Sequence, residues 1–226
     1  MGAAKAGENF MAKVHKYESS AIRVSFDLGR CIHAGECVRG LPAVFDPQKK
    51  PWVQPDQAEA DAVAEVVGRC PTGALQFERL DGGAAEATPT ENVVAIAANG
   101  PLFVKGDVEL VDGNGNTVAR DTRVALCRCG ASENKPYCDG KHSDAGFEAA
   151  SNIPDPKISG GDSGESGALK VILAENGPLV INGPVTVLDS GGDDRCSGSK
   201  TALCRCGASA NKPFCDGAHS KIGFNA

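Results

Sequence analysis

Three cysteines and one histidine lie within sixteen residues at two places in this chain. The two segments are C-R-C-G-A-S-E-N-K-P-Y-C-D-G-K-H at 127–142 and C-R-C-G-A-S-A-N-K-P-F-C-D-G-A-H at 204–219. Thiolates and imidazoles bind soft and borderline metals. The pattern C-x-C-x8-C-x3-H therefore predicts two metal centres, with Cys204 following Cys127 by 77 positions. The predicted ligands are Cys127, Cys129, Cys138, His142, Cys204, Cys206, Cys215 and His219.

Spacing alone leaves the kind of metal open. Three Cys and one His satisfy a tetrahedral zinc ion, and the same donors could hold a 2Fe–2S cluster. Disulfides are a poorer interpretation, because they leave both histidines unexplained and are rare in reducing compartments.

The residues between the ligands resemble those of the CDGSH iron–sulfur domain family, the relatives of mitoNEET. Both copies match C-x-C-x2-S-x3-P-x-C-D-G-x-H, through Ser132, Pro136, Asp139 and Gly140 and through Ser209, Pro213, Asp216 and Gly217. The resemblance covers about 92–226 and implies one 2Fe–2S cluster for each copy. It departs from the family at Lys141, which we expect to place a cation beside His142; the second copy has Ala218.

A neutral imidazole in place of a thiolate makes such a cluster less negative and easier to reduce, as in His-ligated Rieske centres. Protonation of the imidazole removes a ligand, so cluster binding should weaken in mild acid. We therefore expect two acid- and redox-labile clusters.

A second constellation precedes the repeat. Cys31 and Cys37 are separated by five residues, and Cys70 is followed by Pro71. Bacterial ferredoxins end their ligand motif with such a Cys-Pro pair. The pattern resembles the divergent single-cluster ferredoxin family over about 20–80, which implies one 3Fe–4S or 4Fe–4S cluster. Ala34 stands where the middle cysteine would be, and His33 is the nearest candidate for a fourth ligand. A domain that has lost its cluster and only docks partners is the alternative.

The elements that must hold these ligands predict an α+β protein of three pieces, 13–80, 92–150 and 168–226. Asp81–Asn92 and Ser151–Gly167 have the composition of linkers, and we expect the second to be flexible. The last two pieces repeat short β-branched strands before each ligand set. Neither offers enough apolar surface for its own core. We therefore expect a mainly-β pseudo-twofold pair that packs within one chain and exchanges strands.

The first piece has the pattern of a small ferredoxin-like β-α-β-α-β domain. Strands are predicted at Ile22–Phe26, Pro51–Val53 and Ala74–Phe77, and helices at Gly35–Leu41 and Ala58–Val67, with Asp56 as an N-cap. Trp52 should fill the core of this domain.

Several residues near the ligands have two interpretations. Asp139 and Asp216 could cap helices or form Asp-Gly turns. Arg128 and Arg205 could hydrogen-bond near the cluster or stay exposed. Lys135 and Lys212 could tune the histidines or be solvated surface. Cys196 has no counterpart in the first copy, which has Ala119 there, and is either a spare thiol or a redox-sensing one.

Composition limits the function further. The net charge is −6 and no dense Lys/Arg stripe is present, which argues against nucleic acid as a partner. Met1–Ser20 is polar and no stretch is apolar enough to span a bilayer, so we expect a cytoplasmic protein without a membrane partner.

No nucleophile triad or phosphate-binding loop is present, so we expect a redox carrier rather than an enzyme. Its partners would be redox proteins. The alternatives are a donor of clusters to apo-proteins, a sensor of iron or oxidant stress, or a structural zinc module.

Overall fold

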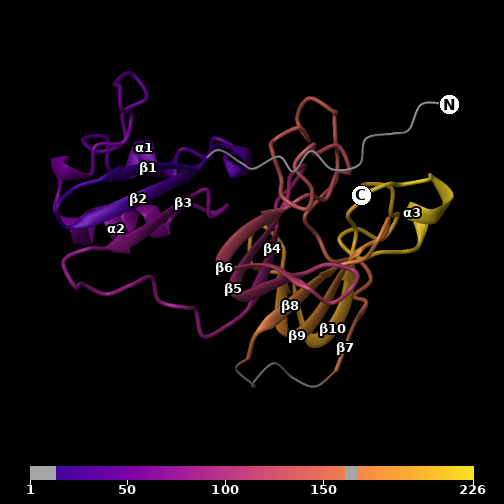
Figure 1. The fold of residues 1–226 in the computed structure, drawn as a ribbon. Coiled ribbons are helices and arrows are strands. Elements are labelled where there is room, and N and C mark those ends of the chain that lie inside the picture. The colour runs from indigo at the N-terminus through magenta and orange to yellow at the C-terminus, as the bar shows by residue number, and fades with distance from the viewer. Residues whose placement is uncertain (1–13, 161–166) are drawn as a thin grey trace, which may run out of the picture.

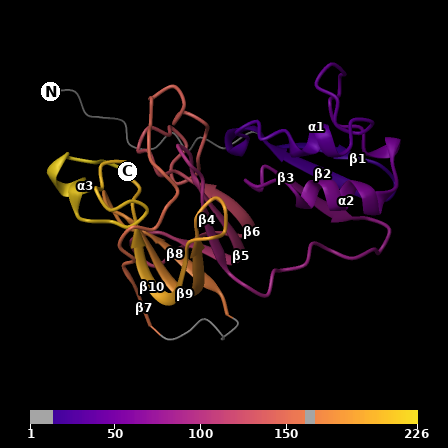
Figure 2. The ribbon, with the colours of Figure 1, turned by 180° about the vertical axis from the view of Figure 1, so that it is seen from behind.

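The chain packs around two hydrophobic cores. The computed structural model describes residues 14–160 and 167–226 (Figure 1). One core lies among residues between Ile22 and Leu75, and the other among residues between Val94 and Phe214. The two cores correspond to a mixed α/β N-terminal region and a mainly-β C-terminal region, which lie side by side in both views (Figure 2).

The N-terminal region is a small antiparallel sheet of order β1-β2-β3 covered by helices. Its elements are β1 (Val14–Glu18), β2 (Ile22–Asp27), η1 (Leu28–Arg30), α1 (Glu36–Gly40), η2 (Pro55–Gln57), α2 (Ala60–Gly68) and β3 (Leu75–Arg79). Strand β2 alternates buried and half-buried residues, as a strand with one face on the core must. Helix α2 buries Val63, Val66 and Val67, which share one face at helical spacing.

Three details of this region differ from the sequence-based expectation. Strand β1 was not predicted; it pairs with β2 along an edge of the sheet. The predicted strand Pro51–Val53 is only a single bridge between Val53 and Phe45. Asp56 does not cap α2, because it lies within η2, and the N-cap position belongs to Glu59. Trp52 does pack against the core, with its ring 4.9 Å from that of Phe26.

The C-terminal region contains the duplicated strands. The first copy has β4 (Val93–Ile96), β5 (Leu102–Val111) and β6 (Thr117–Leu126), and the second has β8 (Leu169–Leu173), β9 (Leu179–Leu188) and β10 (Arg195–Leu203). Turns at 112–116 and 189–194 join the long strands of each copy as hairpins.

The two copies share one small barrel. Strand β4 pairs with β5 of its own copy and with β9 of the other, and β8 pairs with β9 and with β5. The pairings within a copy are antiparallel and those between copies are parallel, so the ring β4-β5-β8-β9 closes with twofold symmetry. Each copy completes its core only with strands of the other, as its limited apolar surface predicts.

The segments between these regions are partly structured. Glu86, in the first predicted linker, pairs with Arg123. In the second, β7 (Ile158–Ser159) adds to the edge of β10, which the prediction of a flexible linker missed. The rest of that prediction, at 161–166, lies outside the described residues. Within the described ranges, no helix is both long and apolar enough to cross a membrane.

Candidate metal centres

The ends of β6 and β10 position the two predicted ligand sets. Cys127 directly follows β6, and its N–H donates to the Pro136 carbonyl at 2.9 Å. The Cys138 N–H donates back to the Ala125 carbonyl at 2.8 Å. The loop therefore folds against its own strand and brings its first and third cysteines together. The second loop repeats both bonds, from Cys204 to Pro213 and from Cys215 to Ala202, each at 2.8 Å.

The four candidate ligands of each loop form two close pairs. The sulfurs of Cys127 and Cys129 are 3.6 Å apart, and the Cys138 sulfur lies 3.4 Å from Nδ1 of His142. The second loop has the same pairs: Cys204 with Cys206 at 3.8 Å, and Cys215 with Nδ1 of His219 at 3.3 Å. The structure thus brings together all eight residues that the spacing selects, and their role as ligands stays a prediction.

This pairing fits a cluster with two irons. A 2Fe–2S core takes two protein donors on each iron. The Cys-Cys pair and the Cys-His pair match that requirement.

Backbone amides surround the sulfurs. The Ala131 N–H donates to Cys129 at 3.4 Å, and the N–H groups of Gly140 and Gly217 donate to Cys138 at 3.5 Å and Cys215 at 3.4 Å. Such bonds stabilise thiolate over thiol. Gly140 and Gly217 adopt φ of 88° and 85°, a left-handed conformation that favours glycine.

Burial has the opposite effect on the pKa of these cysteines. It raises the pKa of Cys138 to about 11 and that of Cys204 to about 11. In the first Cys-Cys pair, a hydrogen bond from Cys129 lowers the pKa of Cys127, so this pair releases its first proton more easily than its second. Loading either site with metal must therefore displace protons.

Arg128 and Arg205 are buried, which excludes the exposed interpretation, and the hydrogen bonds that the structure shows for them go to backbone carbonyls rather than to cysteine sulfurs. Arg128 is fully buried, and its guanidinium donates to backbone carbonyls of Ala97, Gly100, Ala149 and Ala150. Arg205 binds Ala174, Gly177 and Ala226 in the same way. Each arginine therefore fastens its loop to the barrel.

The two arginines also place charge between the loops. Burial lowers the pKa of Arg128 to about 10, while the thiolates of Cys204 and Cys129 act to raise it. Burial likewise lowers the pKa of Arg205, opposed by Cys127. Each guanidinium thus senses the first cysteine of the other loop, so the charge states of the two sites are electrostatically linked.

The backbones of the two ligand loops meet directly. Cys129 and Cys206 form an antiparallel bridge across the pseudo-twofold axis. A Cβ at Gly130 would lie 2.6 Å from the Cys206 carbonyl oxygen, and one at Gly207 would lie 2.4 Å from that of Cys129. Only glycine permits this approach, which places one predicted ligand of each site on directly adjacent stretches of backbone.

Neither aspartate is an N-cap: in the second loop that position belongs to Gly217, and both carboxylates accept N–H groups of their own loops. Asp216 accepts the N–H of Ala218, the first residue of α3 (Ala218–Lys221), and also that of Ala210 across the loop. Asp139 accepts the equivalent bonds from Lys141 and Glu133, but a turn replaces the helix.

The lysines of the motif bond within their own loops. Lys135 and Lys212 donate to the carbonyls of Ser132 and Ser209 within their own loops. Lys141 pairs with Glu133, which offsets the cation that was expected beside His142. The second copy has alanine at both equivalent positions, 210 and 218.

The three N-terminal cysteines also come together. Cys31, Cys37 and Cys70 line one small apolar cavity with Phe26 and Trp52. Burial raises the pKa of Cys31 and of Cys37, and the charge of Cys70 raises both further. Three convergent thiols in an apolar pocket fit an iron–sulfur cluster.

No fourth thiol or imidazole is found among the described residues that line this pocket. Ala34 lines the cavity, where a four-cysteine motif would place a thiol. His33 is exposed and adopts a φ of 57°, and its backbone N–H faces the Cys31 sulfur. Its role as a fourth ligand stays a prediction.

Cys196 lies away from all three sites. It is half-buried against the barrel core, and burial raises its pKa. That environment suits the interpretation as a spare thiol, because a reactive cysteine needs an accessible thiolate.

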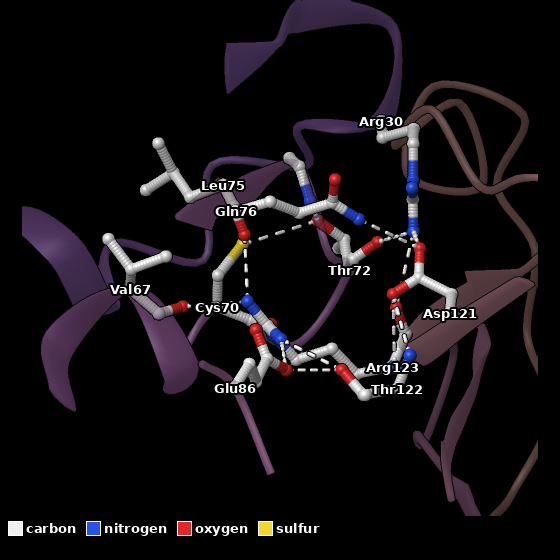
Figure 3. Close-up of polar contacts among 11 residues, drawn as sticks. Arg30, Val67, Cys70, Thr72, Leu75, Gln76, Glu86, Asp121, Thr122 and Arg123 are labelled. Atoms are coloured by element: carbon white, nitrogen blue, oxygen red, sulfur yellow. Dashed lines mark hydrogen bonds and ion pairs between the residues drawn. The ribbon is translucent and has the colours of Figure 1, made fainter. Parts of the chain in front are cut away.

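The sequence reasoning missed a group of residues that joins the two regions. They are Arg30, Asp121, Arg123, Asn134 and Tyr137 (Figure 3 shows the first three). Two of these residues could have been found from the sequence, because they depart from the repeat. The second copy has Gly198 and Lys200 in place of Asp121 and Arg123.

Fold and site together define an iron–sulfur-binding protein with three potential centres, of a kind typical of redox carriers. Residues 17–79 match the family described as "Divergent 4Fe-4S mono-cluster". Residues 99–143 and 176–220 each match the family described as "Iron-binding zinc finger CDGSH type". The chain therefore belongs to the divergent 4Fe-4S mono-cluster family, with two CDGSH units joined to that domain, and the resemblance inferred from the motifs is confirmed.

The curated relatives have no described activity. The chain is 39% identical over 61 residues to "Uncharacterized protein YjdI" of Escherichia coli K12, which is 27% of this chain and 80% of the relative. The same figures hold for "Uncharacterized protein YjdI" of Escherichia coli O157:H7. No solved structure matches the chain.

Proposed function

We propose that this protein is a multi-cluster electron carrier rather than an enzyme. Each CDGSH loop would hold one 2Fe–2S cluster through three thiolates and Nδ1 of its histidine. Cys31, Cys37 and Cys70 would hold a 3Fe–4S or 4Fe–4S cluster. The observation that carries the proposal is the arrangement of each CDGSH donor set in two pairs, at 3.3–3.8 Å, around the end of a barrel strand. When bound, the clusters supply one-electron chemistry.

The chain's own residues support reversible transfer. Backbone N–H groups donate to the sulfurs of Cys138 and Cys215, and the buried Arg128 and Arg205 hold the loops to the barrel, so negative charge can be accommodated without large movement. The serines of both motifs fix the loops as well, because Ser132 donates to the Tyr137 carbonyl at 2.7 Å and Ser209 to that of Phe214 at 2.6 Å. A fixed ligand shell is what a carrier needs if its clusters are to survive repeated reduction.

A redox titration of the purified protein tests this proposal. Optical and low-temperature EPR signals should change reversibly over several reduction cycles, with the iron content unchanged. Irreversible bleaching on the first reduction would argue against a carrier.

A second function is favoured by the exposure of the histidines. His142 and His219 are only partly buried, so protons reach their imidazoles from solvent. Clusters held by such a ligand could be released, and the protein would then donate 2Fe–2S units to apo-protein acceptors or report iron or oxidant stress. Incubation with an apo-ferredoxin distinguishes the roles: transfer of iron and sulfide favours the donor, and retention favours the carrier.

A further inference from the structure

The N-terminal region docks on the first CDGSH unit through buried charge. Nη2 of Arg30 donates to the Thr72 carbonyl at 2.7 Å and also pairs with the Asp121 carboxylate at 2.7 Å (Figure 3). The side chains of Arg30 and Asp121 are only 10% and 4% exposed. A pair so well shielded from water is screened little by salt, so this contact fixes the two regions in one arrangement.

Arg123 holds the loop that carries a predicted ligand. From strand β6 it reaches into the N-terminal region, where Nε donates to the Cys70 carbonyl at 2.7 Å. Its Nη2 donates to the carbonyls of Val67 and Leu75 at 3.0 and 2.7 Å (Figure 3). The same strand ends three residues later at Leu126, directly before Cys127, so one side chain connects a predicted ligand of the N-terminal site to the strand that positions the first CDGSH site.

A second connection lies beside it. Arg30 is bonded to Cys31 through one peptide, and Tyr137 is bonded to Cys138 in the same way. The Arg30 guanidinium lies 4.8 Å above the centre of the Tyr137 ring. The residue next to the predicted ligand Cys31 is therefore in direct contact with the residue next to the predicted ligand Cys138. Asn134, within the CDGSH loop, reinforces it by donating to the Gly29 carbonyl at 2.7 Å.

The second CDGSH unit does not offer this face. Asn211, the equivalent of Asn134, donates instead to the Asp155 carbonyl at 2.9 Å. Strand β7 pairs with β10 at Lys200 and Thr201. At Gly198, the counterpart of Asp121, a Cβ would lie 2.7 Å from the Ile158 side chain. The chain's own 155–159 segment thus covers the surface that the N-terminal region occupies on the first unit.

We propose that this interface makes the first CDGSH unit the electron port between the N-terminal site and the CDGSH pair, with the second unit reached only through the first. In each step one electron leaves the reduced centre and the neighbouring oxidised centre gains it, and no bond forms or breaks. The Cys129–Cys206 bridge joins the two CDGSH loops for the second step. This inference rests on the proposed carrier function and adds the order of transfer.

A pulsed-EPR distance measurement on the full, cluster-loaded chain tests the arrangement. It reads dipolar coupling between centres in a partly reduced sample, because an oxidised 2Fe–2S centre has no net spin, and it needs no repeated redox turnover. The N-terminal centre should lie nearer to the first CDGSH centre than to the second. An equal distance to both, or a shorter one to the second, overturns the proposal.

Substitutions test the route. A flavin photoreductant supplies less than one electron per chain, and freeze-quench EPR follows redistribution from the N-terminal centre to the CDGSH centres. Tyr137→Leu and Asn134→Ala should each slow redistribution severalfold, whereas Tyr137→Phe, which keeps the ring that Phe214 provides in the second unit, should stay near the wild-type rate. Asn211→Ala is the matched control and should leave the rate unchanged. Wild-type rates in both Tyr137→Leu and Asn134→Ala overturn the inference.

The two proposals fail in different ways. If the wild-type clusters do not survive reduction, the carrier function fails. If they cycle reversibly but the interface variants redistribute electrons at the wild-type rate, only the inferred port fails.

Discussion

We expect the imidazole at the end of each ligand set to make these sites sensitive to protons. Burial lowers the pKa of His142, although the Asp139 carboxylate opposes this. A lowered pKa means that the folded state favours the neutral ring, so stability is highest above the usual histidine pKa and falls as the pH drops through the lowered value. Metal binding requires the same neutral ring.

Replacing one histidine by cysteine should make cluster binding at that site less dependent on pH. In His219→Cys, the second cluster should resist acid, because a thiolate that binds iron protonates less readily than an imidazole, and its reduction potential should fall with the added negative charge. Visible absorbance followed from about pH 8 to about pH 5 measures the loss. His142→Cys is the matched variant in the first unit. If the absorbance of the wild type does not change over this range, the histidines are not the acid-sensitive ligands.

We expect Ala34 to decide the nuclearity of the N-terminal cluster. Three cysteines suit a 3Fe–4S cluster, and a fourth thiol in the same cavity would complete a 4Fe–4S site. Ala34→Cys should therefore remove the paramagnetic signal that an oxidised 3Fe–4S centre gives in low-temperature EPR. If the wild type has no such signal and Ala34→Cys changes nothing, the fourth ligand comes from elsewhere.

The loop after each third cysteine is fixed by an aspartate. The N–H groups of Ala210 and Ala218 lower the pKa of Asp216, so the carboxylate stabilises the folded state above the usual aspartate pKa and this stability is lost as the pH falls through the lowered value. Asp216→Asn should therefore unfold at a lower temperature than the wild type near neutral pH, and the difference should shrink in acid. Thermal melts at two pH values measure it. A difference that is the same at both values would show that charge plays no part.

The regular helices and strands could be predicted because local pattern sets them. Residues such as Val63 and Val67 follow helical spacing, the strands carry β-branched residues between turn signals, and the ligand spacing selected all eight residues of the paired sites. Edge strands β1 and β7 were missed because pairing with a neighbouring strand, rather than their own composition, makes them strands. The buried Arg128 could not be predicted either: its partners are carbonyls that only the fold brings near.

At the scale of the whole molecule, the two regions should unfold together because buried charges join them. Arg123→Met would leave Glu86 and the carbonyls of Cys70, Val67 and Leu75 without their partner. For a buried pair, this lowers the free energy of unfolding by about 3–5 kcal/mol. Calorimetry should show one transition for the wild type and two for this variant.

The duplication provides a control for this prediction. Lys200 occupies the equivalent place in the second unit and is exposed, so Lys200→Met should keep the single transition. Two transitions in the wild type would mean that the interface does not couple the regions. The interface itself could not be predicted, because Arg30 and Asp121 are far apart in the sequence, and only the replacement of Asp121 and Arg123 in the second copy marked it.

The identity of the bound metal tests the central claim most directly. Freshly purified protein should be red-brown and contain iron and acid-labile sulfide in a ratio of about one, with both CDGSH units loaded. Colourless protein that holds one zinc ion in each CDGSH loop, and neither iron nor sulfide, would contradict the account of this chain as an electron carrier.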